Sequence, residues 1–280
     1  MLTQWKLINN NDQTLIRSVL KNNTDIEYFN SFIYQMYNKM VYKIIDDELV
    51  ICKPNAMMGN YNFIRYCNSN NSDAVKQKLR NSGFTLRGCD INGKKDKFGE
   101  ECIYYTNECN EKKGKKFARF RNILKRYNFS TDTIFKSGYS EDIEHVVRKW
   151  SLLKKSKHQI KLLELIKKNL GLLNITRVYY KNIIVGFSII EIINKNNGII
   201  IQRLINPDIM DTIIEPNILI HYCDCQNNPN MFLNIGASRN KNIKIAKQKL
   251  KPYKLLKINR QVSKKKFIKN DWIYFKQNLQ

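Results

Sequence analysis

Residues 175–205 read ITRVYYKNIIVGFSIIEIINKNNGIIIQRLI, three apolar runs separated by two short polar turns. The runs at 175–180, 183–192 and 199–205 are rich in β-branched and aromatic residues, which favour strands. Lys181-Asn182 has the length of a tight hairpin turn, and Gly198 suits a turn position with a positive φ. This stretch predicts three consecutive strands of one sheet.

The residues around this stretch continue an alternation of helices and strands. Helices are expected at 142–153 and 159–170, before the three strands. The first has apolar residues at helical spacing, and Gly171 stops the second. After the strands we expect a short helical or irregular stretch between Pro207 and Pro216, which leads to residues 217–223. A strand at 231–236, a helix at 240–250 and a strand at 253–262 follow. Pro252 ends that last helix because proline cannot continue it.

The first half of the chain has a similar mixture of elements. An acidic pair at 46–47 separates two apolar runs, 40–45 and 48–52, which predicts a hairpin. A helix is expected at 73–80, and strands at 84–89 and 102–105 are expected on either side of a charged loop, 92–101. The segment 128–140 contains Ser, Thr and Gly and is taken as a connection. We therefore expect two α/β (α+β) domains, 1–130 and 139–280.

A basic helix is expected at 112–127. Its apolar residues, Phe117, Phe120, Leu124 and Tyr127, follow one another at steps of three or four, which is one helical face. Lysines, arginines and an asparagine project from another face at about 100° per residue. Surface helices usually contain both acidic and basic residues, but residues 112–127 contain no acid. The pattern favours a helix that packs on a core with its apolar face and binds an anion with its basic face. The alternative is a basic face that is only solvated.

The charge of the whole chain indicates a polyanionic partner. There are 49 Lys and Arg against 24 Asp and Glu, a formal net charge of +25. Such a field attracts nucleic acid, anionic lipid or acidic substrates. AT-rich codon usage explains part of the lysine excess but does not require so few acids, and a basic surface without a specific partner is the alternative.

Cysteines and hydropathy narrow the class of protein further. The seven cysteines are scattered and include no Cys-x-x-Cys, so we expect reduced thiols. The run 221–225, His-Tyr-Cys-Asp-Cys, lacks a second ligand pair at finger spacing and is expected to be buried side chains with no metal. The longest apolar run, 183–193, is too short to cross a bilayer, and residues 1–6 show no signal peptide. We expect a cytoplasmic protein, in the host cytoplasm if it is viral.

The order of elements in the second half resembles the core of GNAT acyltransferases. In those enzymes the fourth strand ends in a Val-x-Pro-like turn, and the next helix holds a pyrophosphate; residues 205–208, Ile-Asn-Pro-Asp, stand at that place. A pyrophosphate loop of this kind needs glycines that let backbone N–H groups wrap the anion. The segment 208–216 has no glycine or arginine and three acids. The sequence therefore argues against acetyl-CoA as the donor.

Three short blocks resemble the soluble catalytic domain of lysyl-phosphatidylglycerol synthase and its cytosolic relatives, which have two tandem GNAT-like halves. They are residues 114–122 (GKKFARFRN), 233–238 (LNIGAS) and 247–253 (KQKLKPY). The resemblance implies two GNAT-like domains, each a mixed, mostly antiparallel sheet flanked by helices. It implies transfer of an amino acid from aminoacyl-tRNA, or from another activated amino acid as co-substrate, with no bound cofactor.

On this resemblance, basic residues bind phosphate or an anionic acceptor, and asparagines donate to the reacting carbonyl. The candidates for binding are Lys115, Lys116, Arg119, Arg121, Arg239, Lys247 and Lys249. The candidate catalytic residues are Asn122, Asn234 and Glu191. Solvent exposure is the alternative for Lys247 and Lys249, capping for the two asparagines, and a wet strand end for Glu191.

Four functions follow from these observations. The first is an aminoacyltransferase acting on nucleic acid, tRNA or DNA, such as a modified DNA base in a phage. The second is tRNA-dependent aminoacylation of an anionic phospholipid, where an anionic lipid surface is the partner. The third is a CoA-dependent N-acyltransferase, and the fourth is a non-catalytic nucleic-acid-binding protein.

Overall fold

A computed structural model describes residues 5–20, 27–52, 63–66, 73–81, 84–88, 91–128, 131–238 and 241–261. The chain forms two compact units. The first unit contains Met1–Glu101 and Leu256–Gln280, and the second contains Cys102–Leu255. Strands β6 (Lys94–Tyr105) and β12 (Lys254–Gln261) have residues in both units. These units group the residues differently from the halves 1–130 and 139–280, which stay a prediction.

The first unit is a sheet with short helices. Its strands follow one another as β1 (Lys6–Leu7), β2 (Val41–Ile45), β3 (Glu48–Cys52), β4 (Phe63–Tyr66), β5 (Thr85–Gly88) and β12. The α-helices of this unit are α1 (Gln13–Leu20), α2 (Phe32–Tyr37) and α3 (Asp73–Asn81). Asp46 and Asp47 connect β2 to β3 with φ of 49° and 62°, the left-handed pair that a two-residue hairpin needs. The predicted hairpin is therefore confirmed.

The second unit is built on a mostly antiparallel sheet. Its strands follow one another as β6, β11 (Phe232–Ala237), β10 (Asn197–Ile205), β9 (Ile183–Asn194), β8 (Leu173–Tyr180) and β7 (Thr133–Ser137). The pairs β7–β8, β8–β9 and β9–β10 are antiparallel, and β10–β11 is parallel. The three strands predicted from residues 175–205 are confirmed, with Lys181 and Asn182 in left-handed turn conformations.

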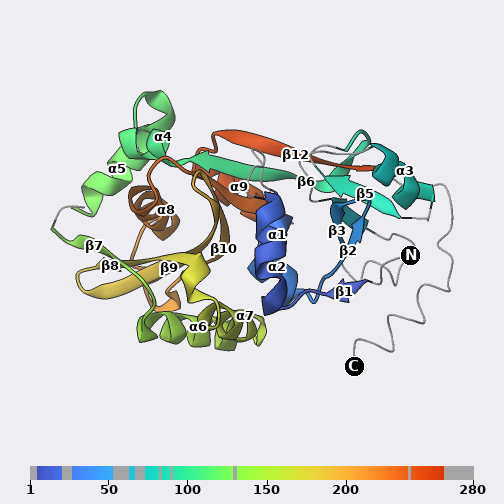
Figure 1. The fold of residues 1–280 in the computed structure, drawn as a ribbon. Coiled ribbons are helices and arrows are strands. Elements are labelled where there is room, and N and C mark those ends of the chain that lie inside the picture. The colour runs from blue at the N-terminus through green and yellow to red at the C-terminus, as the bar shows by residue number, and fades with distance from the viewer. Residues whose placement is uncertain are drawn as a thin grey trace. The chain divides into compact units, whose positions relative to one another are not determined.

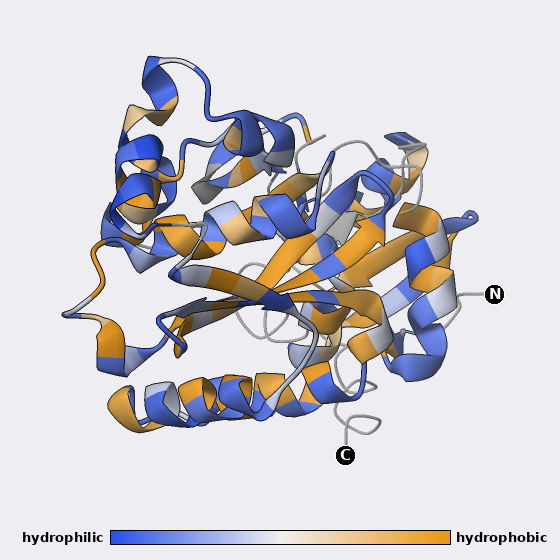
Figure 2. Cartoon of the chain, turned by 90° about the vertical axis from the view of Figure 1, so that its left-hand side faces the viewer, coloured by the Kyte–Doolittle hydropathy of each residue, from blue (hydrophilic) through white to orange (hydrophobic). Residues whose placement is uncertain are grey.

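Helices cover both faces of this sheet. Figure 1 shows α6 (Glu141–Leu153) and α7 (His158–Lys167) on one side of β8–β10, and α8 (Pro216–Asn227) on the other. The other α-helices among the described residues of the unit are α4 (Thr106–Glu111), α5 (Ala118–Arg126) and α9 (Lys241–Lys249). Strand β9 is buried along nearly its whole length because both of its faces are covered, and Figure 2 shows how apolar the central strands are.

Close packing of α8 on the sheet depends on Gly186 in β9. A Cβ placed there would lie 2.3 Å from the Leu204 carbonyl oxygen and 2.7 Å from the Ile220 side chain. Gly186 pairs with Ile205 at the end of β10. The glycine lets α8 approach the strands that lead to residues 206–215.

Three expectations about local structure were wrong. The helix predicted at 112–127 is interrupted, because Lys112 and Gly114 take positive φ and a 3-10 turn, Lys115–Phe117, precedes α5. Its apolar stripe is nevertheless buried. The connection 128–140 contains strand β7, and most of the charged loop 92–101 belongs to β6. The charged residues at the start of β6 do not show a strand pattern, and β7 is short and mostly exposed.

No helix in the described part of the chain has the length and apolar character to cross a bilayer.

Candidate functional site

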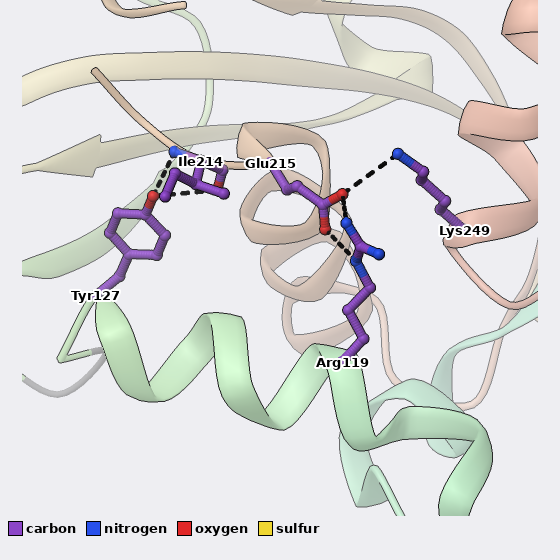
Figure 3. A network of polar contacts seen from close by, with 5 residues as sticks. All are labelled: Arg119, Tyr127, Ile214, Glu215 and Lys249. Atoms are coloured by element: carbon purple, nitrogen blue, oxygen red, sulfur yellow. Dashed lines mark hydrogen bonds and ion pairs between the residues drawn. The ribbon is translucent and has the colours of Figure 1, made fainter. Parts of the chain in front are cut away.

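Two of the predicted anion-binding residues meet at one carboxylate. The guanidinium of Arg119, on α5, donates to both oxygens of Glu215, with Nε 2.6 Å from Oε2. Lys249 Nζ, from the end of α9, lies 3.4 Å from Oε1 of the same carboxylate. Figure 3 shows the three side chains converging from α5, α9 and the start of α8. All three belong to the second unit.

Glu215 holds an unusual position in the backbone. It is the residue before α8 and has φ 56° and ψ 52°, a left-handed conformation that costs a non-glycine residue free energy. Pro216 follows at the first helical position, where proline is accepted because its missing N–H would be unpaired. The Glu215 side chain is only 15% exposed, so it points into the cluster of cations rather than into solvent.

The electrostatics favour the ionised carboxylate. Burial raises the pKa of Glu215, but the hydrogen bonds and charge of Arg119, together with Lys249, more than offset this, and the pKa lies below its ordinary value. The same bond raises the pKa of Arg119. The site at neutral pH therefore contains two cations and one fixed anion.

Tyr127, at the end of α5, fixes the residue before Glu215. Its hydroxyl donates to the Ile214 carbonyl oxygen at 3.0 Å and accepts from the Ile214 amide at 2.5 Å (Figure 3). Both backbone groups of Ile214 are thus satisfied by one side chain. Residues at both ends of α5 therefore hold this segment, Arg119 through the Glu215 side chain and Tyr127 through the Ile214 backbone.

Other predicted site residues bind the protein's own backbone. Arg121 donates to the carbonyl oxygens of Lys112 and Gly114, at 2.5 Å and 2.9 Å, and so supports the turn before α5. Lys247 Nζ donates to three successive carbonyl oxygens at the end of β11, at 2.6–2.9 Å. Asn234 is 2% exposed, and its side chain accepts from the Gly236 amide. These contacts are structural, and the binding or catalytic roles predicted for the three residues stay predictions.

The remaining candidates lie in several different elements. Lys115 is exposed in the 3-10 turn before α5, and Asn122 is exposed on α5. Lys116 pairs with Glu108, with Nζ 2.7 Å from Oε2. Glu191 is fully buried in β9. Arg239 lies outside the described residues.

The acids after Pro207 are largely neutralised. Asp208 forms an ion pair with Lys149 of α6, and Glu215 is held by Arg119 and Lys249. Asp211 of the same segment is exposed, and the expectation that the segment repels pyrophosphate stays a prediction. Sequence reasoning missed Glu215 as a site residue because its partners lie far away in the sequence.

A second cluster, of buried cysteine and histidine side chains, lies between α4 and α8. Cys109 of α4 lies beside His221 and Cys225 of α8, all buried, with their ligand atoms within 4.8 Å of one another. His221 Nδ1 is 3.3 Å from the Arg203 guanidinium, which can only donate, so Nδ1 accepts and Nε2 carries the ring proton. Nε2 lies 3.9 Å from the Cys225 sulfur. In this tautomer Nε2 has no lone pair for a metal, and the prediction of no metal here stays a prediction.

Burial sets the protonation of this cluster. It lowers the pKa of His221 well below its usual range, and the charge of Arg203 lowers it further. Burial also raises the pKa of the Cys225 thiol, with the neighbouring Cys109 adding to the effect. A neutral imidazole and the neutral Cys225 thiol therefore lie beside the ion pair of Arg203 with Asp224.

The fold matches solved structures over nearly the whole chain. A conserved protein of unknown function from Bacteroides thetaiotaomicron has a TM-score of 0.75 and 18% identity, covering 94% of this chain and 100% of that one. L-PGS from Bacillus licheniformis has a TM-score of 0.63 and 13% identity, covering 97% of each chain. FemX has a TM-score of 0.56 and 8% identity, covering 99% of this chain and 100% of that one.

At these identities the likeness shows the fold alone. No protein-family profile and no curated protein matches the sequence. The chain has the GNAT-like fold of the lysyl-phosphatidylglycerol synthase catalytic domain, as the sequence blocks indicated. Similarity of fold does not by itself determine the reaction.

Proposed function

We propose that this protein is an aminoacyltransferase that takes an activated amino acid, from aminoacyl-tRNA or an equivalent ester, and passes it to a polyanionic acceptor. The observation that carries the proposal is the fold shared with L-PGS and FemX from end to end. The formal net charge of +25 supports polyanions as substrates. Nucleic acid is the acceptor that we favour.

The chemistry needs positioning more than strong acid–base catalysis. A hydroxyl or amine of the acceptor attacks the ester carbonyl, and the tRNA hydroxyl leaves with a proton. Bringing the two substrates together supplies much of the rate, and hydrogen-bond donors at the developing oxyanion supply more. On this proposal Lys115 contacts tRNA phosphate, and the exposed amide of Asn122 is the candidate donor to the carbonyl.

A product-mass experiment tests the proposal. The protein is incubated with charged tRNA, with free amino acid plus ATP, or with acetyl-CoA, and each donor is offered DNA, RNA or phosphatidylglycerol. We expect an aminoacyl mass to be added from charged tRNA onto nucleic acid. Transfer to phosphatidylglycerol would show that the acceptor is a lipid and not nucleic acid. Transfer from acetyl-CoA alone would refute the proposal that the donor is an activated amino acid.

A charge reversal tests the proposed tRNA contact. Lys115→Glu should weaken tRNA binding and make it less dependent on salt, because a phosphate contact releases a counterion. The matched control is Lys155→Glu, an exposed lysine between α6 and α7. Equal losses in both variants would mean that the charge acts non-specifically and that Lys115 is not the contact.

A further inference from the structure

The contact of Arg119 and Lys249 with Glu215 has the chemistry of an occupied anion site. The planar fork of arginine binds carboxylate and phosphate oxygens in the same two-pronged way. Lysine adds a point charge, and the start of a helix carries partial positive charge. Here Arg119 and Lys249 bind one carboxylate at the first residue before α8, a helix of 12 residues.

The carboxylate is supplied by the protein and held in place against a conformational cost. Glu215 has φ 56°, which favours glycine, and the neighbouring Ile214 is held at both backbone groups by Tyr127. An incidental surface ion pair would not require a strained backbone. A flexible side chain could reach its partner from an unstrained backbone conformation. The geometry is that of a built-in anion.

We infer that Glu215 is an internal anion that occupies a phosphate-type site formed by Arg119 and Lys249, and thereby excludes phosphate and pyrophosphate groups from the start of α8. The inference deepens the proposed function and rests on one part of it, the nature of the donor. A donor that is an aminoacyl ester does not need a pyrophosphate site at the start of α8. Exclusion acts by occupation, because the carboxylate already uses the donors that a pyrophosphate would need.

Removing the carboxylate should open the site. Glu215→Gly suits the observed φ of 56°, since glycine takes positive φ without steric cost. Glu215→Gln keeps the size of the side chain and removes its charge. Calorimetric titration with inorganic pyrophosphate should show binding to both variants at least about tenfold tighter than to the wild type, because two cations are released.

The control for net charge is Asp208→Asn, which removes an acid of the same segment that pairs with Lys149 instead. It should bind pyrophosphate as the wild type does. The double variant Arg119→Gln with Glu215→Gly should lose the gain. Equal binding by Glu215→Gly and Asp208→Asn, or binding by the wild type that Arg119→Gln abolishes, would overturn the inference.

The two proposals fail separately. A gain of pyrophosphate binding without any aminoacyl transfer would leave the internal anion standing and remove the proposed function. Aminoacyl transfer without that gain would keep the function and remove the internal anion.

Discussion

The hydroxyl of Tyr127 makes both of its hydrogen bonds to a single residue, donating to the carbonyl and accepting from the amide of Ile214. The Tyr127 hydroxyl thus forms the hydrogen bonds that another backbone segment would otherwise form with Ile214, just before α8. The ring itself is buried, 7% exposed, so water does not compete for these groups.

Tyr127→Phe should lower the free energy of unfolding by about 1–2 kcal/mol, because the backbone groups of Ile214 lose their partner while the ring stays packed. Urea denaturation of both proteins measures the difference. Tyr253→Phe is the control, since that ring is 49% exposed, and it should change stability by less than about 0.5 kcal/mol. Equal effects would show that the bonds to Ile214 contribute nothing.

Gly186→Ala should destabilise the second unit by about 2–3 kcal/mol, since the new methyl would lie 2.3 Å from the Leu204 carbonyl oxygen and must push α8 or β10 away. Thermal and urea unfolding measure the loss. Gly171→Ala is the matched control, because a Cβ there meets nothing within 4 Å. A Gly186→Ala protein as stable as Gly171→Ala would contradict the close approach.

Lys247→Met should cost about 1.5–3 kcal/mol of stability, because three carbonyl oxygens at the end of β11 lose a charged donor. Hydrogen exchange at residues 235–238 should rise in parallel. Lys241→Met on the same helix is the control and should be close to neutral. If Lys247 bound substrate phosphate instead, its loss would weaken tRNA binding and leave stability and exchange unchanged.

His221 should make the protein sensitive to mild acid. The folded ring stays neutral because its pKa is lowered by burial and by Arg203, whereas an unfolded histidine takes up a proton near pH 6.5. Below about pH 6.5 the unfolded state therefore binds an extra proton, and stability falls by up to about 1.4 kcal/mol per pH unit until the folded ring titrates. Above that pH this contribution is constant.

Urea denaturation between pH 5 and 8 measures this dependence. His221→Gln should flatten the slope below pH 6.5, and the exposed His145→Gln should keep it. An unchanged slope in His221→Gln would mean that other groups cause the acid sensitivity.

The sequence predicted the elements whose burial leaves a clear pattern of apolar residues, either a long apolar run in a buried strand or an apolar stripe on one face of a helix. The strands at 183–194 and 197–205 are long apolar runs, and α6 has an apolar stripe. Residues 217–223 were assigned to no element, although they lie in α8, because α8 is buried on nearly every side and a helix without an exposed face has no amphipathic period. Strand β7 was missed because four of its five residues are exposed.

The candidate site was predictable in its cations and not in its anion. Arg119 and Lys249 were identified by charge and by resemblance, but Glu215 was counted only as an acid in a repelling segment. Its partner Arg119 comes from a helix far away in the sequence, so only the fold brings them together. Cys109 beside His221 was missed for the same reason.

The way the two units share the chain has a consequence for synthesis on the ribosome. The second unit is one uninterrupted segment, Cys102–Leu255, and all its strands and helices exist before the rest of β12 is made. The first unit starts earlier but lacks a strand until residues 259–261 emerge and pair with β5. The part of the protein that is translated first is therefore completed last, and until then the edge of β5 that pairs with β12 lacks this partner strand.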